Sequence, residues 1–178
     1  MVSKVVNLIL RGAAALIALL LTALIGNVIA STTNAQGSAT AAVNFAMFCT
    51  AWAWLALIYG VATDFRPSLA RPVIKIPVEA VAVLLSLLAA IVLAAKLKAT
   101  NCGAINVKDM ADSWIAFGSS NDEKRCREIQ ASTLFMWMLW AIFCPLLFFT
   151  IREGRNAYGT FQGSSKSSSL PSMSHIGA

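Results

Sequence analysis

The chain has 178 residues, of which 58% are hydrophobic and 12% are charged, and its mean hydropathy is +0.71. This balance excludes an ordinary soluble domain and indicates an integral membrane protein. The formal net charge is +6, but no basic face with interleaved aromatic residues lies outside the apolar segments, so nucleic acid is not expected as a partner.

Four apolar runs follow one another along the chain, each close to the ~20 residues that a helix needs to cross the hydrocarbon layer. None of them alternates apolar with polar residues as the strands of a membrane barrel do. We therefore predict an all-α membrane protein, an antiparallel left-handed bundle of four transmembrane helices within residues 1–153. The predicted helices span residues 5–30, 41–63, 73–95 and 132–151.

The first run has a basic start and small residues before Ser31, as a cleavable signal peptide does. It is longer than the core of such a peptide, so we expect a retained helix. Arg11 lies near its start, and small residues on the same helical face predict a surface where another helix packs closely. These residues are Ala14, Ala18 and Gly26. Asn27 near the end of this helix and Asn44 near the start of the second are expected to form hydrogen bonds between helices or to cap one.

The third run contains a single carboxylate, Glu79, near its start. An ionisable group in a membrane helix is costly unless it is paired or used in function. Because the first and third helices run in the same direction, Arg11 and Glu79 lie toward the same leaflet, and we predict an ion pair between them. The small residues predicted to pack along the Glu79 face are Ala82, Ser86, Ala90 and Ala94.

An alternative keeps these two charges apart. Glu79 closely follows Pro77 and would then lie in the first helical turn, where the helix dipole and headgroup water stabilise a carboxylate. Arg11 would extend separately to the interface. A catalytic or proton-carrying Glu79 is not expected, because no further titratable groups follow along a path through the membrane.

The third connection, residues 96–129, has mixed charge and two cysteines, and we place it on the exoplasmic side. Cys102 and Cys126 bracket it and are predicted to form a disulfide, the alternative being two free thiols at helix ends. Cys49 and Cys144 lie inside helices as small hydrophobic residues. No metal site is expected, since the one histidine, His175, lies in the tail and no close cysteine pair begins a site.

Orientation follows from the distribution of basic residues. The first connection, residues 31–40, has no charge, whereas Lys4 and Arg11 precede it, and further basic residues occupy the second connection and follow the last helix. Both termini are therefore predicted to be cytoplasmic. The tail, residues 154–178, is rich in Ser and Gly and is predicted to be disordered.

Several of these residues together resemble the fungal non-classical export protein 2 family, which belongs to the MARVEL-domain proteins. They are Val43-Asn44-Phe45, Met47-Phe48-Cys49, Leu57-Ile58-Tyr59-Gly60, the pair Cys102 and Cys126, Cys126-Arg127 and Gln130-Ala131. In this family and in the similar plant Casparian-strip membrane proteins, an Arg in the first helix and an acid in the third recur. Here they match Arg11 and Glu79, although the acid is more usually Asp.

The resemblance implies a plasma-membrane organiser and not an enzyme. Such a protein self-associates, interacts with sterol and sphingolipid, and concentrates in furrow-like eisosome domains shaped by cytoplasmic BAR-domain scaffolds. No cofactor is expected, and a bound sterol or sphingolipid is compatible with this role. The alternative is an oligomeric channel or transporter, although the central helical turns are apolar and offer no polar path within one chain.

Overall fold

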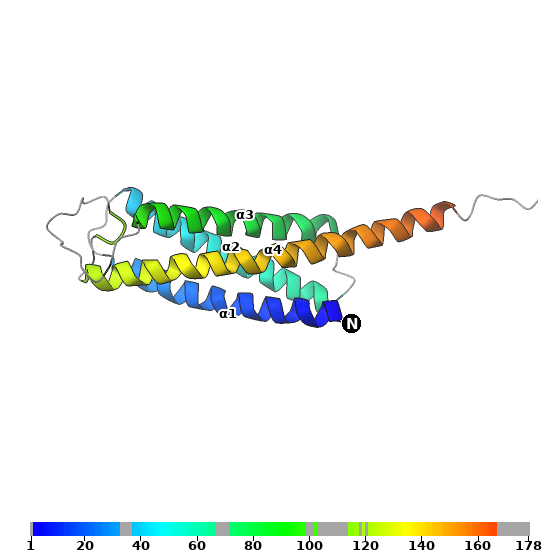
Figure 1. The fold of residues 1–178 in the computed structure, drawn as a ribbon, viewed down its shortest axis with the longest axis horizontal. Coiled ribbons are helices and arrows are strands. Elements are labelled where there is room, and N and C mark those ends of the chain that lie inside the picture. The colour runs from blue at the N-terminus through cyan, green and yellow to red at the C-terminus, as the bar shows by residue number, and fades with distance from the viewer. Residues whose placement is uncertain are drawn as a thin grey trace, which may run out of the picture.

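The computed structural model describes residues 2–32, 37–66, 72–98, 102, 114–117, 119 and 121–166. This part of the chain forms four helices, α1 (Val2–Ala30), α2 (Ser38–Phe65), α3 (Pro72–Leu97) and α4 (Asp122–Lys166). All four are long and apolar enough to cross a membrane. The start of α1 lies at one end of the bundle, the terminal end, and the start of α4 lies at the other, the disulfide end (Figure 1).

The helices form a ring in which α1 and α3 each pack against α2 and α4. Consequently α1 and α3 face each other across the diagonal. Buried residues recur along α1 at alternating steps of four and three: Asn7, Arg11, Ala14, Ala18, Leu21, Ile25 and Val28. A mean spacing of 3.5 residues keeps one face toward its neighbours only if the helices wind around each other in a left-handed sense. The predicted all-α four-helix bundle is confirmed.

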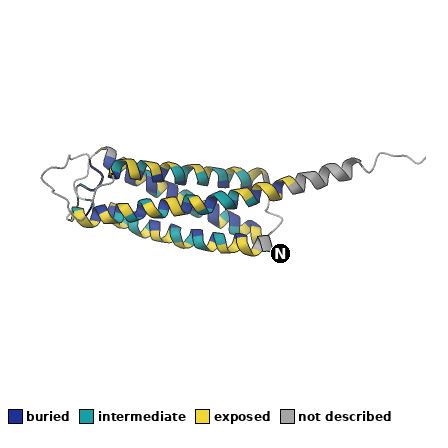
Figure 2. Cartoon of the chain, viewed as in Figure 1, coloured by how far each residue is buried: buried dark blue, intermediate teal, exposed yellow. Residues whose placement is uncertain are grey.

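The interior combines alanines from three helices with large apolar side chains from the fourth. The buried stripes lie on the inner faces of the helices, and exposed residues cover the outer faces (Figure 2). The buried alanines of α1, α2 and α3 include Ala14, Ala18, Ala46, Ala53, Ala56, Ala82, Ala89 and Ala90, and α4 contributes Ile129, Met136, Leu139, Phe143 and Leu146. The outward residues include Leu16, Leu19, Leu55, Ile58, Leu84 and Phe148. This distribution suits a bilayer, where close backbone approach stabilises helix packing and lipid tails accept the large side chains.

The fourth helix is longer than predicted at both ends. It begins at Asp122 and not at 132, so the predicted connection 96–129 is too long, and it continues to Lys166, so the predicted disorder from residue 154 is wrong as far as 166. Residues 167–178 lie outside the described part. The side chain of Asn121 accepts a hydrogen bond from the Lys124 backbone N–H at 3.0 Å and caps the helix. Asp122 and Glu123 in the first turn add a favourable interaction with the helix dipole.

Candidate functional site

A buried ion pair crosses the bundle diagonal near the terminal end. Arg11 Nη2 donates to Glu79 Oε1 at 2.6 Å, and each side chain is only 1% exposed. The structure therefore brings together the two charges that the sequence placed in one leaflet. Because α3 begins at Pro72, Glu79 lies about two turns inside the helix. The alternative of two separate interfacial charges does not hold.

Three further residues extend this pair into an ion network of Arg11, Asp64, Lys75, Glu79 and Glu153. Arg11 Nε lies 3.0 Å from Asp64 Oδ2, in ion-pair range although not aligned as a hydrogen bond. Lys75 Nζ lies 3.5 Å from Asp64 Oδ1 and 3.6 Å from Glu153 Oε2. The network draws on all four helices, and its charges alternate in sign along the chain of contacts. The side chains of Arg11, Glu79 and Lys75 are at most 8% exposed, whereas Asp64 is 26% and Glu153 52% exposed, so water screens these two carboxylates most.

Gly60 on α2 makes the space that the Arg11 guanidinium occupies. A Cβ at this position would lie 1.6 Å from Arg11 Nη1 and 2.3 Å from Cζ. No side chain fits there while the guanidinium keeps its place. Gly60 is thus as much a part of the site as the charges, because it lets an arginine reach the interior of the bundle.

The centre of the ion network is not fully hydrogen-bonded within the described residues. Arg11 Nη1 and Glu79 Oε2 are buried and have no hydrogen-bond partner there, and neither does Asn7 Oδ1, about one turn before Arg11 on α1. A buried polar atom without a partner costs roughly 1–3 kcal/mol. Much of the attraction between Arg11 and Glu79 therefore offsets desolvation, so the net stabilisation by the pair is smaller than its short distance suggests. In the described residues, no group of three His, Cys, Asp or Glu side chains could hold a metal ion.

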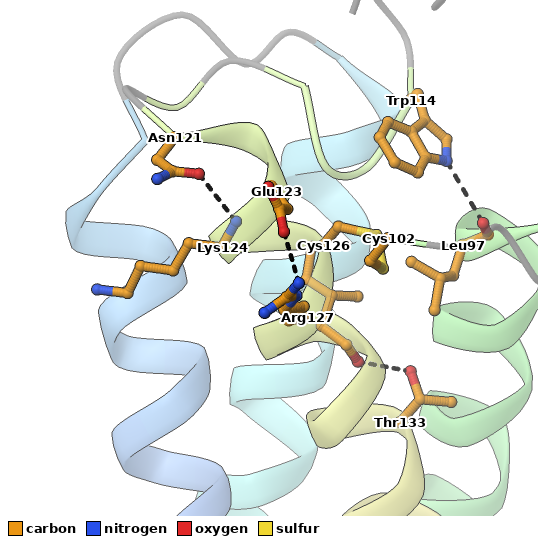
Figure 3. The surroundings of a disulfide bond; sticks show 10 residues. Leu97, Cys102, Trp114, Asn121, Glu123, Lys124, Cys126, Arg127 and Thr133 are labelled. Carbon is orange, nitrogen blue, oxygen red and sulfur yellow. Dashed lines mark hydrogen bonds and ion pairs between the residues drawn. A yellow bond between two sulfur atoms is a disulfide. The ribbon is translucent and has the colours of Figure 1, made fainter. Parts of the chain in front are cut away.

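The opposite end is fastened covalently. Cys102 and Cys126 form a disulfide with their Cα atoms 5.7 Å apart, and it links the segment after α3 to the second turn of α4. Beside it, the Trp114 indole N–H points to the Leu97 carbonyl oxygen at the end of α3, at 3.4 Å (Figure 3). Trp114 is buried, so it anchors this segment on the bundle. Cys49 and Cys144 are free thiols within α2 and α4.

Arg125 is a second buried cation, which the sequence did not predict. It is 1% exposed, donates from Nε to the Ile115 carbonyl oxygen at 3.2 Å and from Nη1 to Thr32 Oγ1 at 2.6 Å. Thr32 also pairs with Ser119 in an isolated antiparallel bridge. One guanidinium thus joins the end of α1, the segment around Ile115 and the start of α4. Its position among mixed charges is typical of a solvated arginine, so the sequence held no signal for this role.

Of the predicted small packing residues, five are buried: Ala14, Ala18, Ala82, Ser86 and Ala90. The predicted packing roles of Gly26 and Ala94 are wrong. Ala94 is exposed, and a Cβ on Gly26 would meet nothing within 4 Å, so neither supports close packing. Both errors arise because the prediction followed every fourth residue along the helix, and each such step turns about 40° past one full revolution. The buried face instead repeats every 3.5 residues and therefore reaches Ile25 on α1 and Leu93 on α3.

The two predicted interhelical asparagines have different outcomes. Asn27 Nδ2 donates to Glu128 Oε1 at 2.6 Å and joins α1 to α4. Asn44 is exposed on α2 and forms no hydrogen bond to another helix among the described residues, so its predicted role is wrong. Trp54 takes that role for the first two helices, with its indole N–H 3.1 Å from Thr22 Oγ1 on α1.

Comparison with known proteins gives one family. The family model of the MARVEL domain, described as a membrane-associating domain, matches residues 4–149. The match covers all of the ion network except Glu153, together with the disulfide and Arg125. Searches of curated proteins and of solved structures gave no significant match.

Proposed function

Because the chain belongs to the MARVEL family of membrane-associating domains, we propose that it is a non-enzymatic organiser of the plasma membrane. It self-associates and interacts with sterol or sphingolipid to stabilise membrane microdomains. The observation that carries this proposal is the cover of large apolar side chains on the outer faces of all four helices, from Leu16 on α1 to Phe148 on α4. The bundle presents this outward surface to lipid and to other copies, so that surface is where function is expected.

The finer assignment rests on the resemblance to the fungal non-classical export protein 2 family. From this resemblance we propose that the chain concentrates in furrow-like eisosome domains and that a cytoplasmic BAR-domain scaffold is its partner. Within the described residues, the bundle has no folded domain beyond its helices and the segments joining them, so a scaffold would contact the ends of helices and the tail.

We further propose that both termini are cytoplasmic. The disulfide supports this orientation, because disulfides persist on the oxidising side of a membrane and this one lies at the end opposite the start of α1. The basic residues Arg66, Arg152 and Arg155 lie at the terminal end, as expected for a cytoplasmic face. A cysteine introduced at Ser168 should not react with an impermeant reagent applied to intact cells. Reaction from outside would reverse the orientation.

The organiser proposal can be tested with full-length protein labelled on the tail and reconstituted in giant vesicles. The vesicles have the same phospholipid and either contain or lack sterol and sphingolipid. We expect clustering, measured by energy transfer between labelled copies at fixed protein density, to increase with sterol and sphingolipid content. Equal energy transfer in every lipid mixture would contradict the proposal. Ion flux that appears with assembly in the same vesicles would instead favour the oligomeric channel or transporter.

A further inference from the structure

A hollow of about 350 Å³ lies on α4 at the terminal end, lined by Phe148, Ile151, Arg152 and Arg155. These four positions are separated by three, one and three residues, so they share one face of the helix. All four side chains are exposed, Phe148 by 62% and Ile151 by 39%. The face is therefore outward, and it differs from the face on which Glu153 contacts Lys75.

This hollow lies at the edge of the hydrocarbon layer. The apolar part of α4, residues 132–151, has about the length needed to cross that layer. At 1.5 Å per residue, Arg152 and Arg155 lie within about 6 Å of its end, at the depth of lipid phosphates. Phe148 and Ile151 lie on the other side of the boundary, at the depth of acyl chains. The hollow thus has a cationic half and an apolar half in the order in which a membrane lipid presents its phosphate and its tails.

The charges of the hollow have no carboxylate partner in the described part of the chain. Among the residues that the structure describes, neither Arg152 nor Arg155 has an ion-pair partner, whereas Lys75 and Arg11 are both paired with carboxylates. Two guanidinium groups one turn apart can bind phosphate oxygens through paired N–H donors. A zwitterionic headgroup has no net charge, whereas an anionic headgroup keeps a net negative charge beside the two guanidinium groups, so an anionic headgroup fits better.

We propose that this hollow is a binding site for an anionic glycerophospholipid of the leaflet at the terminal end. Arg152 and Arg155 bind the headgroup phosphate, and Phe148 and Ile151 contact the first part of an acyl chain. This site is independent of microdomain formation and of sterol or sphingolipid binding, because it requires only that α4 crosses the membrane.

The test uses full-length protein in nanodiscs containing phosphatidylserine and phosphatidylcholine with identical acyl chains. Native mass spectrometry of the released protein counts each bound lipid. We expect phosphatidylserine to be retained in preference to phosphatidylcholine. Arg152→Gln with Arg155→Gln should lower its apparent affinity by roughly tenfold or more, given about 1 kcal/mol for each basic residue near an anionic surface.

The control is Lys124→Gln with Arg127→Gln, which removes two exposed cations from the same helix at the opposite end, each of which forms an ion pair with a carboxylate four residues away. Both leaflets of the nanodisc contain the anionic lipid, and both double variants lower the net charge by two, so a loss that depends on net charge alone would be equal in the two variants. The control should leave phosphatidylserine retention unchanged. An equal loss in both variants, or equal retention of the two lipids by the native chain, would overturn the proposal.

Two further arms separate a lipid site from a simple anion site and from a contact between copies. Phe148→Ala keeps both charges and should weaken phosphatidylserine retention severalfold, while free glycerophosphoserine at the same concentration should not displace the lipid. Displacement by the free headgroup would indicate a simple anion site. If the Arg152 and Arg155 double variant alters the number of chains per particle in pure phosphatidylcholine and not lipid retention, the hollow is a contact between copies and the proposal fails.

Discussion

Replacing Gly60 by alanine should destabilise the bundle through the ion pair, although this substitution changes no charged residue. The added Cβ would lie 1.6 Å from Arg11 Nη1, 2.3 Å from Cζ and 2.9 Å from Nη2. Since such distances are impossible, the guanidinium must shift. We expect this shift to break its 2.6 Å contact with Glu79, which is 1% exposed.

The expected cost is that of breaking a buried pair by removing one partner, roughly 3–5 kcal/mol, reduced to the extent that Arg11 can reach Asp64 or water at the terminal end. At about 2–4 °C per kcal/mol for a chain of this size, the melting temperature in lipid nanodiscs should fall by roughly 6–20 °C. Gly26→Ala is the matched control. Its Cβ would meet nothing within 4 Å, and alanine favours the helix by up to about 1 kcal/mol, so it should be neutral or stabilising.

The decisive measurement repeats Gly60→Ala in a background where Arg11 and Glu79 are both leucine, or both alanine should leucine prove too large beside α2. With no guanidinium to displace, the alanine should cost less than about 1 kcal/mol. The difference between the two backgrounds is the coupling energy between Gly60 and the pair. If Gly60→Ala lowers the melting temperature equally in both backgrounds, Gly60 acts through helix packing alone and its assignment to the site is wrong.

Three other changes test the two ends of the bundle. Arg11→Leu and Glu79→Leu should each lower stability by up to roughly 3–5 kcal/mol, and the double variant should be less harmful than either, since no orphan charge remains; strictly additive melting temperatures would contradict a direct pair. Replacing Cys102 and Cys126 by serine should lower the free energy of unfolding by about 3 kcal/mol, as the chain-entropy account gives for a separation of 24 residues. If both thiols of the native chain are alkylated without reduction, as read by peptide mass spectrometry, the disulfide is excluded. Arg125→Gln should increase hydrogen exchange in the segment around Ile115 more than in the helices, because it removes donors to that segment and to Thr32; unchanged exchange there would show that the disulfide suffices.

The ion pair could be predicted because lone charges in apolar helices stand out. Arg11 and Glu79 each lie within a run of about twenty apolar residues, and equal depth follows from helix direction alone. The places of Asp64 and Lys75 in the ion network were not predicted, because charges at the ends of membrane helices ordinarily face water and headgroups. Gly60 could have been found by following the 3.5-residue period along α2, in which it falls on the buried face with Ala53, Ala56 and Thr63.

The start of α4 was predicted wrongly for a different reason. Hydropathy assigned residues 122–129 to a loop, since the first turns of α4 are charged. Local signals pointed the other way: Asn121 is a favourable N-cap residue, and two acids follow it. The position of Arg125 could not be predicted by any such rule, because its partners Thr32 and Ile115 come from distant segments that only the folded bundle brings together.

The two ends of the bundle are fastened by different means, and this bears on what one chain can do alone. The disulfide and Arg125 fix one end, and the ion network fixes the other. Between them the buried hydroxyl groups of Thr50, Ser86 and Ser132 donate to carbonyl oxygens of their own helices. Within the described residues, these three hydroxyl groups are thus satisfied in their own helices and do not link one helix to another. A conducting function, the alternative to the proposed organiser, would need a polar path that these groups do not form by themselves and that an interface between copies could supply.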